Sequence, residues 1–432
     1  MAQMKKCFLI TVNMGYGHQR TAFPLKFLSQ DEVIVANDYP GIPKKDKEIW
    51  EKTRKFYETV SRLESNFPFL GKLIFKFFDQ FQKIKPFYPK KSLNSPNFST
   101  KMTYALFKKL NWGKDLIEKI KNQAAKIKSN LPIVSTFFTP AFMAEYFQYP
   151  GEIFCVVCDA DISRSWVSIF PQKSKIKYFA PTERVVERLK LYGVKKENIF
   201  LTGYPLPKES IETVKEDLNF RILNLDSEKN FLKKYQDLVN LKLGNLPEKP
   251  DHPLTILFSV GGAGAQKEIG FLILKSLKEN LLKENLKIIL SAGIRRKIKD
   301  YFLKKIKSLK LEGKIGKSLE ILYEEKIENY FQRFNLKLRK VDILWTKPSE
   351  LSFYSALGIP IICTPPLGSQ EEFNLRWLIK SGFGILQENP KYTKEWLFDW
   401  IKKGYLAEMA MEAFVEGEKF GTFNIERIIK GL

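Results

Sequence analysis

The chain has 432 residues, of which 72 are Lys or Arg and 48 are Asp or Glu, so its formal net charge at pH 7 is +24. An apolar fraction of 44% is enough for two hydrophobic cores, and a chain of this length exceeds what one core usually supports. Four cysteines exclude a disulfide scaffold, and the lack of a long uncharged apolar run excludes a membrane-spanning helix. Residues 1–6 leave no room for a cleavable signal, so we expect a cytoplasmic protein.

Short apolar runs alternate with helical patterns in the N-terminal half. Residues 7–12 predict a buried first strand, Asn13-Met-Gly-Tyr-Gly-His18 forms a glycine turn, and residues 19–28 have the apolar spacing of a helix. Further strands are predicted at 133–137 and 153–158. In the second of these, Cys155 and Cys158 are expected on opposite faces, which disfavours a shared metal or disulfide.

The C-terminal half repeats the alternation. Strands are predicted at 256–260, 288–292, 343–346 and 359–364, and the first is followed by the glycine-rich turn Gly261-Gly-Ala-Gly-Ala-Gln266. The third leads into Lys347-Pro-Ser-Glu-Leu-Ser352, and the fourth into a polar loop that opens a helix. Such an order predicts parallel α/β sheets with polar groups at the carboxyl ends of the strands.

Residues 67–91 combine many Phe and Lys side chains. Rings in the acyl boundary and ammonium groups on anionic lipid would give reversible membrane attachment, at about 1 kcal/mol for each Lys or Arg. A buried helix and loop of the first domain is the alternative. Nucleic acid is a less favoured partner, because the basic residues are spread widely and no common binding motif appears.

These motifs, in this order, resemble the GT-B glycosyltransferases, specifically the group of MurG-like N-acetylglucosaminyltransferases and plant-type monogalactosyldiacylglycerol synthases. The resemblance covers most of the chain and implies an α/β GT-B fold, with two doubly wound Rossmann-like domains facing a central cleft. It implies an acceptor and membrane-side domain at 1–205, a linker with a helical insert at 206–252, and a donor-binding domain at 253–400. Helices at 401–432 are expected to pack back toward the N-terminal domain.

On the acceptor side, the resemblance makes His18 and Asp159 the candidate catalytic groups. Either a neutral imidazole or a strand-end carboxylate could take the proton of an acceptor hydroxyl, although both residue types also serve simply as helix caps. The implied acceptor-binding residues are Gly15, Gly17, Arg164 and Trp166. His252, the other histidine, is expected to be a solvated loop residue.

On the donor side, a diphosphate is expected at the glycine-rich turn, because glycines let backbone N–H groups approach it and a helix N-terminus follows. Lys347 would offset phosphate charge, and the polar loop would bind sugar hydroxyls. The implied donor-binding residues are Gly261, Gly262, Gly264, Gln266, Gly293, Lys347, Ser349, Glu350, Ser352, Gln370, Glu371 and Asn374. No metal or other cofactor is expected, since backbone N–H groups and basic side chains meet the phosphate charge in this fold.

The chain departs from the family pattern at two places. Relatives carry a Glu that holds the donor ribose where Ser355 stands here, and they often carry a His between the strand-end Asp and the Trp, where this chain has residues 163–165. Asp159-Ala-Asp161 does spell Asp-x-Asp, but away from the expected diphosphate.

The leading prediction is a glycosyltransferase, peripheral to the inner face of the cell membrane, that moves a sugar from a nucleoside-diphosphate donor, by default a UDP-sugar, to a lipid or lipid-linked acceptor. A nucleotide-sugar 2-epimerase of the same fold is one alternative, less favoured because His18 is the only histidine near the expected cleft. A catalytically degenerate nucleotide- or lipid-binding relative is the other. The sequence leaves the oligomeric state open.

Overall fold

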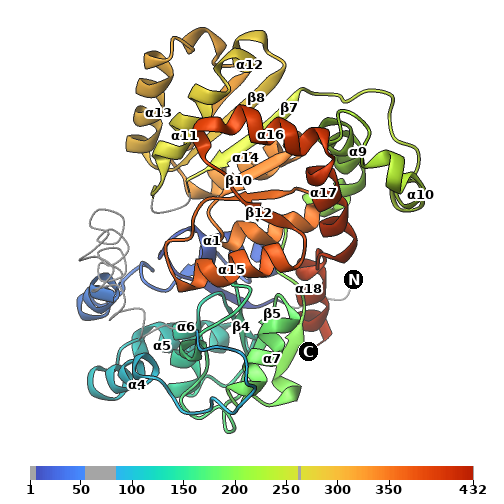
Figure 1. The fold of residues 1–432 in the computed structure, drawn as a ribbon. Helices are drawn as coiled ribbons and strands as arrows, with labels where there is room; N and C mark the ends of the chain where they lie inside the picture. The colour runs from blue at the N-terminus through green and yellow to red at the C-terminus, as the bar shows by residue number, and fades with distance from the viewer. Residues whose placement is uncertain (1–5, 54–83, 261–263, 432) are drawn as a thin grey trace. The chain divides into compact units, whose positions relative to one another are not determined.

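The computed structural model describes residues 6–53, 84–260 and 264–431. The chain divides into two compact units, each with its own sheet and covering helices (Figure 1). The first unit comprises residues 1–206, 367–373 and 420–432, and the second comprises residues 207–366 and 374–419.

The first unit is built on a six-stranded parallel sheet in the order β2-β1-β3-β4-β5-β6. Its strands are β1 (Phe8–Thr11), β2 (Ile34–Val35), β3 (Ile133–Ser135), β4 (Ile153–Val156), β5 (Ile176–Ala180) and β6 (Ile199–Leu201). Its helices are α1 (Tyr16–Ala22), α4 (Phe98–Leu110), α5 (Lys114–Lys126), α6 (Phe138–Tyr146), α7 (Glu183–Leu191) and α18 (Gly421–Gly431), with 3-10 turns η1 (Phe23–Leu28), η2 (Arg164–Trp166) and η3 (Lys196–Asn198). The helix expected at 19–28 is therefore split, with α1 beginning earlier and η1 completing it.

The last helix of the chain completes the core of the first unit. Ile425 and Ile429 of α18 are fully buried and join the apolar cluster formed by β1, β3, β4 and β5. The start of α18 lies against the backbone after β6, where a Cβ at Gly421 would come within 2.1 Å of the Tyr204 carbonyl oxygen. Only glycine fits this close approach. The rest of the C-terminal segment, residues 401–419, belongs to the second unit.

The second unit has its own six-stranded parallel sheet, in the order β12-β11-β10-β7-β8-β9. Its strands are β7 (Leu254–Ser259), β8 (Leu286–Gly293), β9 (Leu319–Tyr323), β10 (Ile343–Thr346), β11 (Ile361–Cys363) and β12 (Gly384–Leu386). The helices are α8 (Lys208–Glu212), α9 (Val214–Leu225), α10 (Leu232–Leu243), α11 (Lys267–Ser276), α12 (Lys278–Lys283), α13 (Arg296–Ser308), α14 (Ile327–Leu338), α16 (Thr393–Lys402) and α17 (Tyr405–Glu416), with η4 (Glu312–Lys314), η5 (Glu350–Leu357) and η6 (Pro390–Tyr392). Helix α15 (Ser369–Lys380) begins in the segment 367–373 of the first unit and continues into the second unit. Residues 207–252, expected as a linker with a helical insert, supply α8, α9 and α10 to this unit.

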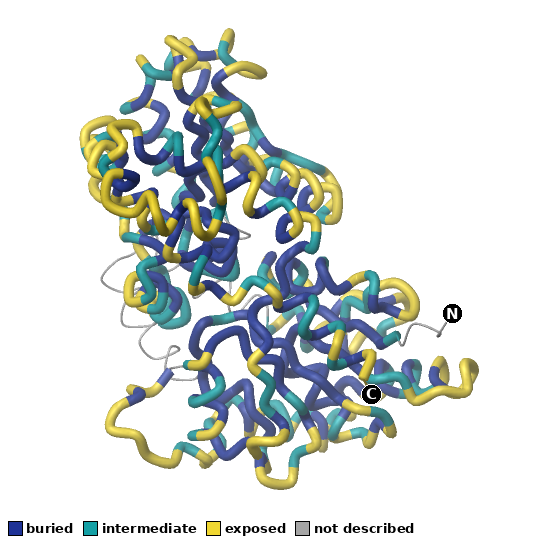
Figure 2. Tube along the Cα trace, turned by 90° about the vertical axis from the view of Figure 1, so that its right-hand side faces the viewer, coloured by how far each residue is buried: buried dark blue, intermediate teal, exposed yellow. Residues whose placement is uncertain are grey.

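The central strands are largely apolar because helices cover both faces of each sheet. Every residue of β7 and β10 is buried, and Figure 2 shows the buried trace running through each unit beneath exposed helical turns. Continuous apolar runs are typical of parallel sheets covered on both sides. The prediction of two doubly wound α/β domains is confirmed. Among the described residues, no helix is long and apolar enough to cross a bilayer.

Candidate functional site

Each sheet reverses its winding direction at one point, and the candidate residues gather there. In the first unit the chain moves outward from β1 to β2 and then returns to β3 on the other side of β1. In the second unit it moves from β7 through β8 to β9 and returns to β10 on the other side of β7. Open α/β sheets bind ligands outside the carboxyl ends of the strands at such switch points.

His18 lies in α1, directly after the glycine turn that follows β1. Its Nδ1 is 2.9 Å from the carbonyl oxygen of Thr136, the residue after β3, so the contact spans the switch point of the first sheet. A carbonyl oxygen only accepts hydrogen bonds, and the proton of a neutral ring therefore sits on Nδ1. Nε2 is then the basic nitrogen, as a general base requires.

Neighbouring side chains hold the imidazole and its turn in place. The ring centroid of His18 is 4.7 Å from that of Phe137 and 6.3 Å from that of Trp166, and its Nδ1 is 3.5 Å from Cys158 Sγ. The turn itself is tied to the end of β2, because the Asn13 N–H donates to Asn37 Oδ1 at 2.8 Å.

Sequence patterns gave no signal for Asn37 or for the Thr136 carbonyl, since both come from distant strand ends. Gly15 adopts a φ of +96° at the N-cap of α1, and Gly17 lies within that helix. The two predicted acceptor-side glycines thus lie at the N-cap and in the first turn of the helix that carries His18.

The two aspartates after β4 occupy different environments. Asp159 is half-buried and follows the end of β4 by three residues, and its catalytic role stays a prediction. Asp161 is almost fully buried and accepts from Arg188 Nε at 2.8 Å and Arg188 Nη2 at 2.7 Å. This bidentate pair commits Asp161 to the core, and no cluster that could hold a metal ion occurs among the described residues.

Arg164 and Trp166 occupy the 3-10 turn that follows. The Arg164 guanidinium is buried and donates to the carbonyl oxygens of Asn94, Val167 and Ser168. It therefore organises the backbone of this region, and burial lowers its pKa. Trp166 is also buried, with its ring 5.3 Å from that of Phe138. Their roles in acceptor binding stay predictions.

Strand register in the second unit brings four loops to one edge. Ser259 of β7 pairs with Ser291 of β8 and with Thr346 of β10, and Thr346 pairs with Cys363 of β11. The segments that follow these residues all emerge at the carboxyl edge. They contain the glycine-rich turn, Gly293, Lys347 and the loop after β11.

The glycine-rich turn is described from Gly264 onward, and the predicted Gly261 and Gly262 lie outside the described residues. Gly264 has a φ of +70°, and a Cβ there would lie 2.9 Å from Ile298 Cδ1. Gln266, at a φ of +62°, caps α11 and donates from Nε2 to the Pro365 carbonyl oxygen at 2.8 Å. Its Oε1 accepts from Thr364 Oγ1 at 2.7 Å, which joins this turn to the loop after β11.

Lys347, Ser349 and Glu350 follow β10 and are half-buried at the same edge. Asn374 is buried in α15, and its Nδ2 donates to the Pro348 carbonyl oxygen at 3.3 Å. This bond fixes the turn that carries Lys347. Gly293 ends β8 at a φ of +64°.

The remaining donor-side predictions lie in η5 and α15. Ser352 and Ser355 are fully buried, and Ser355 Oγ donates to the Ser352 carbonyl oxygen at 2.8 Å. Ser352 thus lies inside the unit, whereas Ser349 is partly accessible. Gln370 and Glu371 are half-buried in the first turn of α15, where Glu371 Oε2 accepts from the Leu367 N–H at 2.9 Å.

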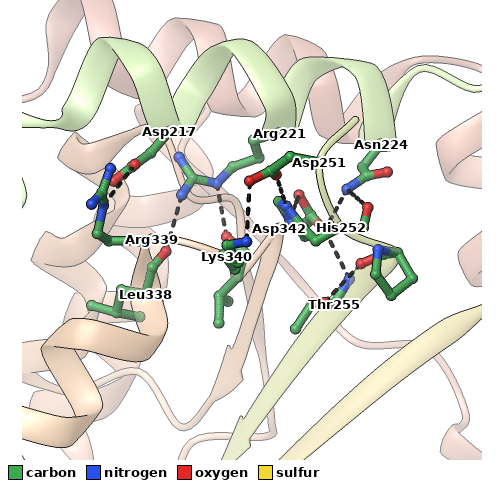
Figure 3. Close-up of polar contacts among 12 residues, drawn as sticks. Asp217, Arg221, Asn224, Asp251, His252, Thr255, Leu338, Arg339, Lys340 and Asp342 are labelled. Carbon is green, nitrogen blue, oxygen red and sulfur yellow. Dashed lines mark hydrogen bonds and ion pairs between the residues drawn. The ribbon is translucent and has the colours of Figure 1, made fainter. Parts of the chain in front are cut away.

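A second polar cluster lies at the opposite, amino edge of this sheet (Figure 3). Asp342, directly before β10, accepts from the Thr255 N–H at 2.8 Å and from Asn224 Nδ2 at 3.0 Å. His252 Nε2 is 3.3 Å from Asp342 Oδ1, and His252 Nδ1 bonds Asp251. Arg221 of α9 lies beside them and donates to four backbone carbonyl oxygens, those of Leu338, Val341, Leu357 and Gly358.

The prediction that His252 is a solvated loop residue is wrong. Only 7% of its side chain is exposed, because it is held between Asp251 and Asp342. Burial disfavours the charged ring, but the two carboxylates outweigh burial and raise the pKa of His252 above its ordinary value of 6.5. The cluster joins α9 to the amino ends of β7 and β10. Ligands bind at the opposite, carboxyl edge of such sheets, so we assign the cluster a structural role.

Comparison with known proteins adds a family profile and several relatives. Residues 247–374 match a family described as a domain of unknown function, DUF6938. A processive diacylglycerol beta-glucosyltransferase of Bacillus subtilis (strain 168) is 25% identical over 261 residues, which are 59% of this chain and 56% of that protein. The protein of the same name in Bacillus licheniformis is 23% identical over 269 residues, 60% of this chain and 58% of that protein.

The match therefore spans less than two thirds of the length of these relatives. Among solved structures, the S. aureus MnaA-UDP co-structure aligns with 98% of this chain and 95% of its own, at 14% sequence identity and a TM-score of 0.48. The resemblance to lipid-modifying glycosyltransferases that the motifs indicated is confirmed at modest identity.

Proposed function

We propose that this protein is a glycosyltransferase that moves a hexosyl group from a nucleoside-diphosphate sugar, with uridine as the nucleoside, to the hydroxyl of a diacylglycerol-type lipid. One observation carries the proposal. The switch point of the second sheet carries a glycine-rich turn and Lys347, groups that suit a diphosphate. The switch point of the first sheet carries His18, whose Nε2 can accept a proton from a hydroxyl. The names of the two Bacillus relatives support the acceptor class.

In the proposed reaction the acceptor hydroxyl oxygen forms a bond to the anomeric carbon while the bond from that carbon to the diphosphate oxygen breaks. His18 Nε2 takes the hydroxyl proton, with Asp159 as the second candidate base. The leaving diphosphate carries the new negative charge, which Lys347 and the backbone N–H groups of the glycine-rich turn would stabilise. Relatives hold the donor ribose with a Glu at the position of Ser355. In this chain Glu350 would take over that contact. We propose no metal or other cofactor.

We further propose that the protein attaches peripherally to the inner face of the cell membrane, where such an acceptor resides. Of the Phe- and Lys-rich segment 67–91, residues 67–83 lie outside the described part. In the described remainder, Tyr88 is 67% exposed, whereas Phe87 is buried beneath the Arg184 guanidinium, 3.7 Å from its ring centroid. An exposed ring beside Lys90 and Lys91 supports interfacial contact.

The donor site is tested by calorimetric titration with UDP and with a panel of other nucleoside diphosphates. We expect Lys347→Ala to weaken UDP binding roughly 10- to 100-fold, as expected when one charge-assisted hydrogen bond is lost. Lys340→Ala is the matched control, because Lys340 lies near the amino end of the same strand, 3.2 Å from Asp251. It should leave UDP affinity unchanged.

Transfer itself is tested by following labelled sugar from UDP-glucose into organic-extractable lipid in the presence of diacylglycerol. Lipid labelling that His18→Asn abolishes supports the proposal. UDP binding without labelling for any sugar donor would instead favour a degenerate binding protein, and interconversion of UDP-N-acetylhexosamines would favour the epimerase. No binding of any nucleotide would overturn the donor site.

A further inference from the structure

The outer face of α13, in the second unit, carries positive charge that the proposed chemistry does not use. The segment 295–310 contains a single acidic residue, Asp300, and the basic residues Arg295, Arg296, Lys297, Lys299, Lys304, Lys305, Lys307 and Lys310. The helix buries Ile298, Phe302 and Ile306 against the unit. Its exposed basic side chains, which we call the α13 basic face, are Arg296, Lys297, Lys304, Lys307 and Lys310.

The α13 basic face keeps a net positive charge, since it holds five basic side chains beside one exposed carboxylate, that of Asp300. Within residues 6–53, 84–260 and 264–431, none of its five side chains forms an ion pair. Nearby basic residues behave differently, since Lys287, Lys337 and Arg333 share Glu320, and Arg333 also pairs with Glu324. Like charges three or four residues apart on a helix destabilise it. An anionic partner would remove that repulsion.

The side chains on this face fit a lipid surface better than a nucleic acid. Leu303 is 38% exposed between the lysines, and Ile315, beyond the helix end, is 41% exposed. Long Lys stems with apolar neighbours suit a headgroup layer, where ammonium groups meet phosphates and Leu reaches the acyl boundary. The face offers no Asn, Gln or exposed aromatic ring to read or stack on bases.

We propose that the α13 basic face docks on the anionic phospholipid headgroups of a membrane. The proposal rests on the proposed function, because a lipid acceptor has to be reached at a bilayer surface. Each Lys close to an anionic leaflet strengthens binding roughly fivefold, so three of them acting together give roughly 100-fold. This surface belongs to the second unit, whereas the described residues 84–91 belong to the first.

The test is sedimentation of the full-length protein with vesicles of phosphatidylcholine alone and of phosphatidylcholine mixed with phosphatidylglycerol. We expect binding to the mixed vesicles only, weakened by added salt. The variant Lys304→Ala/Lys307→Ala/Lys310→Ala should lose roughly 100-fold in partition to mixed vesicles. Its UDP affinity should not change, which shows that it is folded.

The matched control removes three exposed lysines from α10, as Lys233→Ala/Lys234→Ala/Lys242→Ala. Helix α10 lies on the opposite side of the second unit from α13 in Figure 1, and the control lowers the net charge by the same amount. It should bind mixed vesicles like the unmodified protein.

Equal vesicle binding by the α13 variant and the unmodified protein would overturn the inference and leave the glycosyltransferase proposal standing. A loss confined to the α10 variant would overturn it as well. Tighter binding to duplex DNA or to RNA than to vesicles, removed by the α13 substitutions, would show that the face serves nucleic acid instead. Failure of the unmodified protein to bind UDP would count against the proposed function alone.

Discussion

The two histidines of this chain occupy opposite kinds of position. His18 follows a glycine turn at the carboxyl edge of the first sheet, and its Nδ1 meets a backbone carbonyl. His252 precedes β7 at the amino edge of the second sheet and lies between two carboxylates. The first position is where α/β sheets bind ligands, and the second is where they are held together.

The difference lies in the partner of each ring and not in the residue type. A carbonyl oxygen fixes which nitrogen holds the proton and leaves the other nitrogen basic. Two carboxylates favour the charged ring, which has no basic nitrogen left. The comparison therefore predicts that substitutions at the two clusters separate activity from stability.

The largest effect is expected at His18. His18→Asn keeps an N–H donor close to the Thr136 carbonyl but removes the basic nitrogen, so the rate of sugar transfer should fall roughly 10²- to 10⁴-fold. The free energy of unfolding should stay within about 0.5 kcal/mol of its original value. Steady-state assays with labelled UDP-glucose measure the rate, and His252→Asn is the control, which should retain activity. A loss below tenfold would show that the imidazole only binds substrate.

The next largest effect is expected at Arg221, in the cluster around His252. Arg221→Met removes the guanidinium hydrogen bonds to the carbonyl oxygens of residues 338, 341, 357 and 358, and we expect it to lower the free energy of unfolding by about 3–5 kcal/mol. Urea unfolding followed by tryptophan fluorescence measures the loss. UDP affinity of the folded variant should be unchanged.

Arg339 provides the control for that substitution. It pairs with the exposed Glu216 and with Asp217, which also accepts from Thr213, and 44% of the Arg339 side chain is exposed, so Arg339→Met should cost only about 1 kcal/mol. Equal destabilisation by the two variants would contradict the view that burial makes the Arg221 cluster important.

Local patterns were sufficient to predict β1, β3, β4, β7, β8, β10 and β11, but not β2, β5, β6, β9 or β12. Runs such as Leu254–Ser259 are largely apolar and buried throughout because helices cover both faces, and such runs stand out against the helical spacing around them. Glycine turns after β1 and β7 were equally visible, since the positive φ values at Gly15 and Gly264 suit glycine. The predicted strand at 359–364 shortens to Ile361–Cys363, as the flanking prolines cannot donate to a sheet.

Partners that are distant in sequence could not be predicted. Arg221 bonds carbonyls more than a hundred residues away, and Asp161 is neutralised by Arg188 from a different element. The segment after β10 shows the same limit, because Ser349 and Ser352 look alike in sequence but only Ser352 is fully buried. Burial and pairing depend on the tertiary arrangement, which residue type alone does not encode.

The smallest effect separates the two histidines by pH. The pKa of His252 is raised in the folded protein above its ordinary value of 6.5, so the folded state binds this proton more tightly than the unfolded chain. The stability that the charged ring contributes is complete below about pH 6.5 and is lost as pH rises through the folded-state pKa. Burial also raises the pKa of Asp342, which acts in the same direction.

His252→Gln removes the titrating ring. Below about pH 6.5 the free energy of unfolding should therefore fall by about 1 kcal/mol, which is the order of one hydrogen bond. The difference between the variant and the original protein should shrink as pH rises. Urea unfolding at a series of pH values measures both curves. His18→Asn is the control and should leave the pH dependence of unfolding in place. If the difference in unfolding free energy between His252→Gln and the original protein instead grew with pH, the His252 ring would be neutral in the folded protein. The two histidines would then differ only in their position on the sheets.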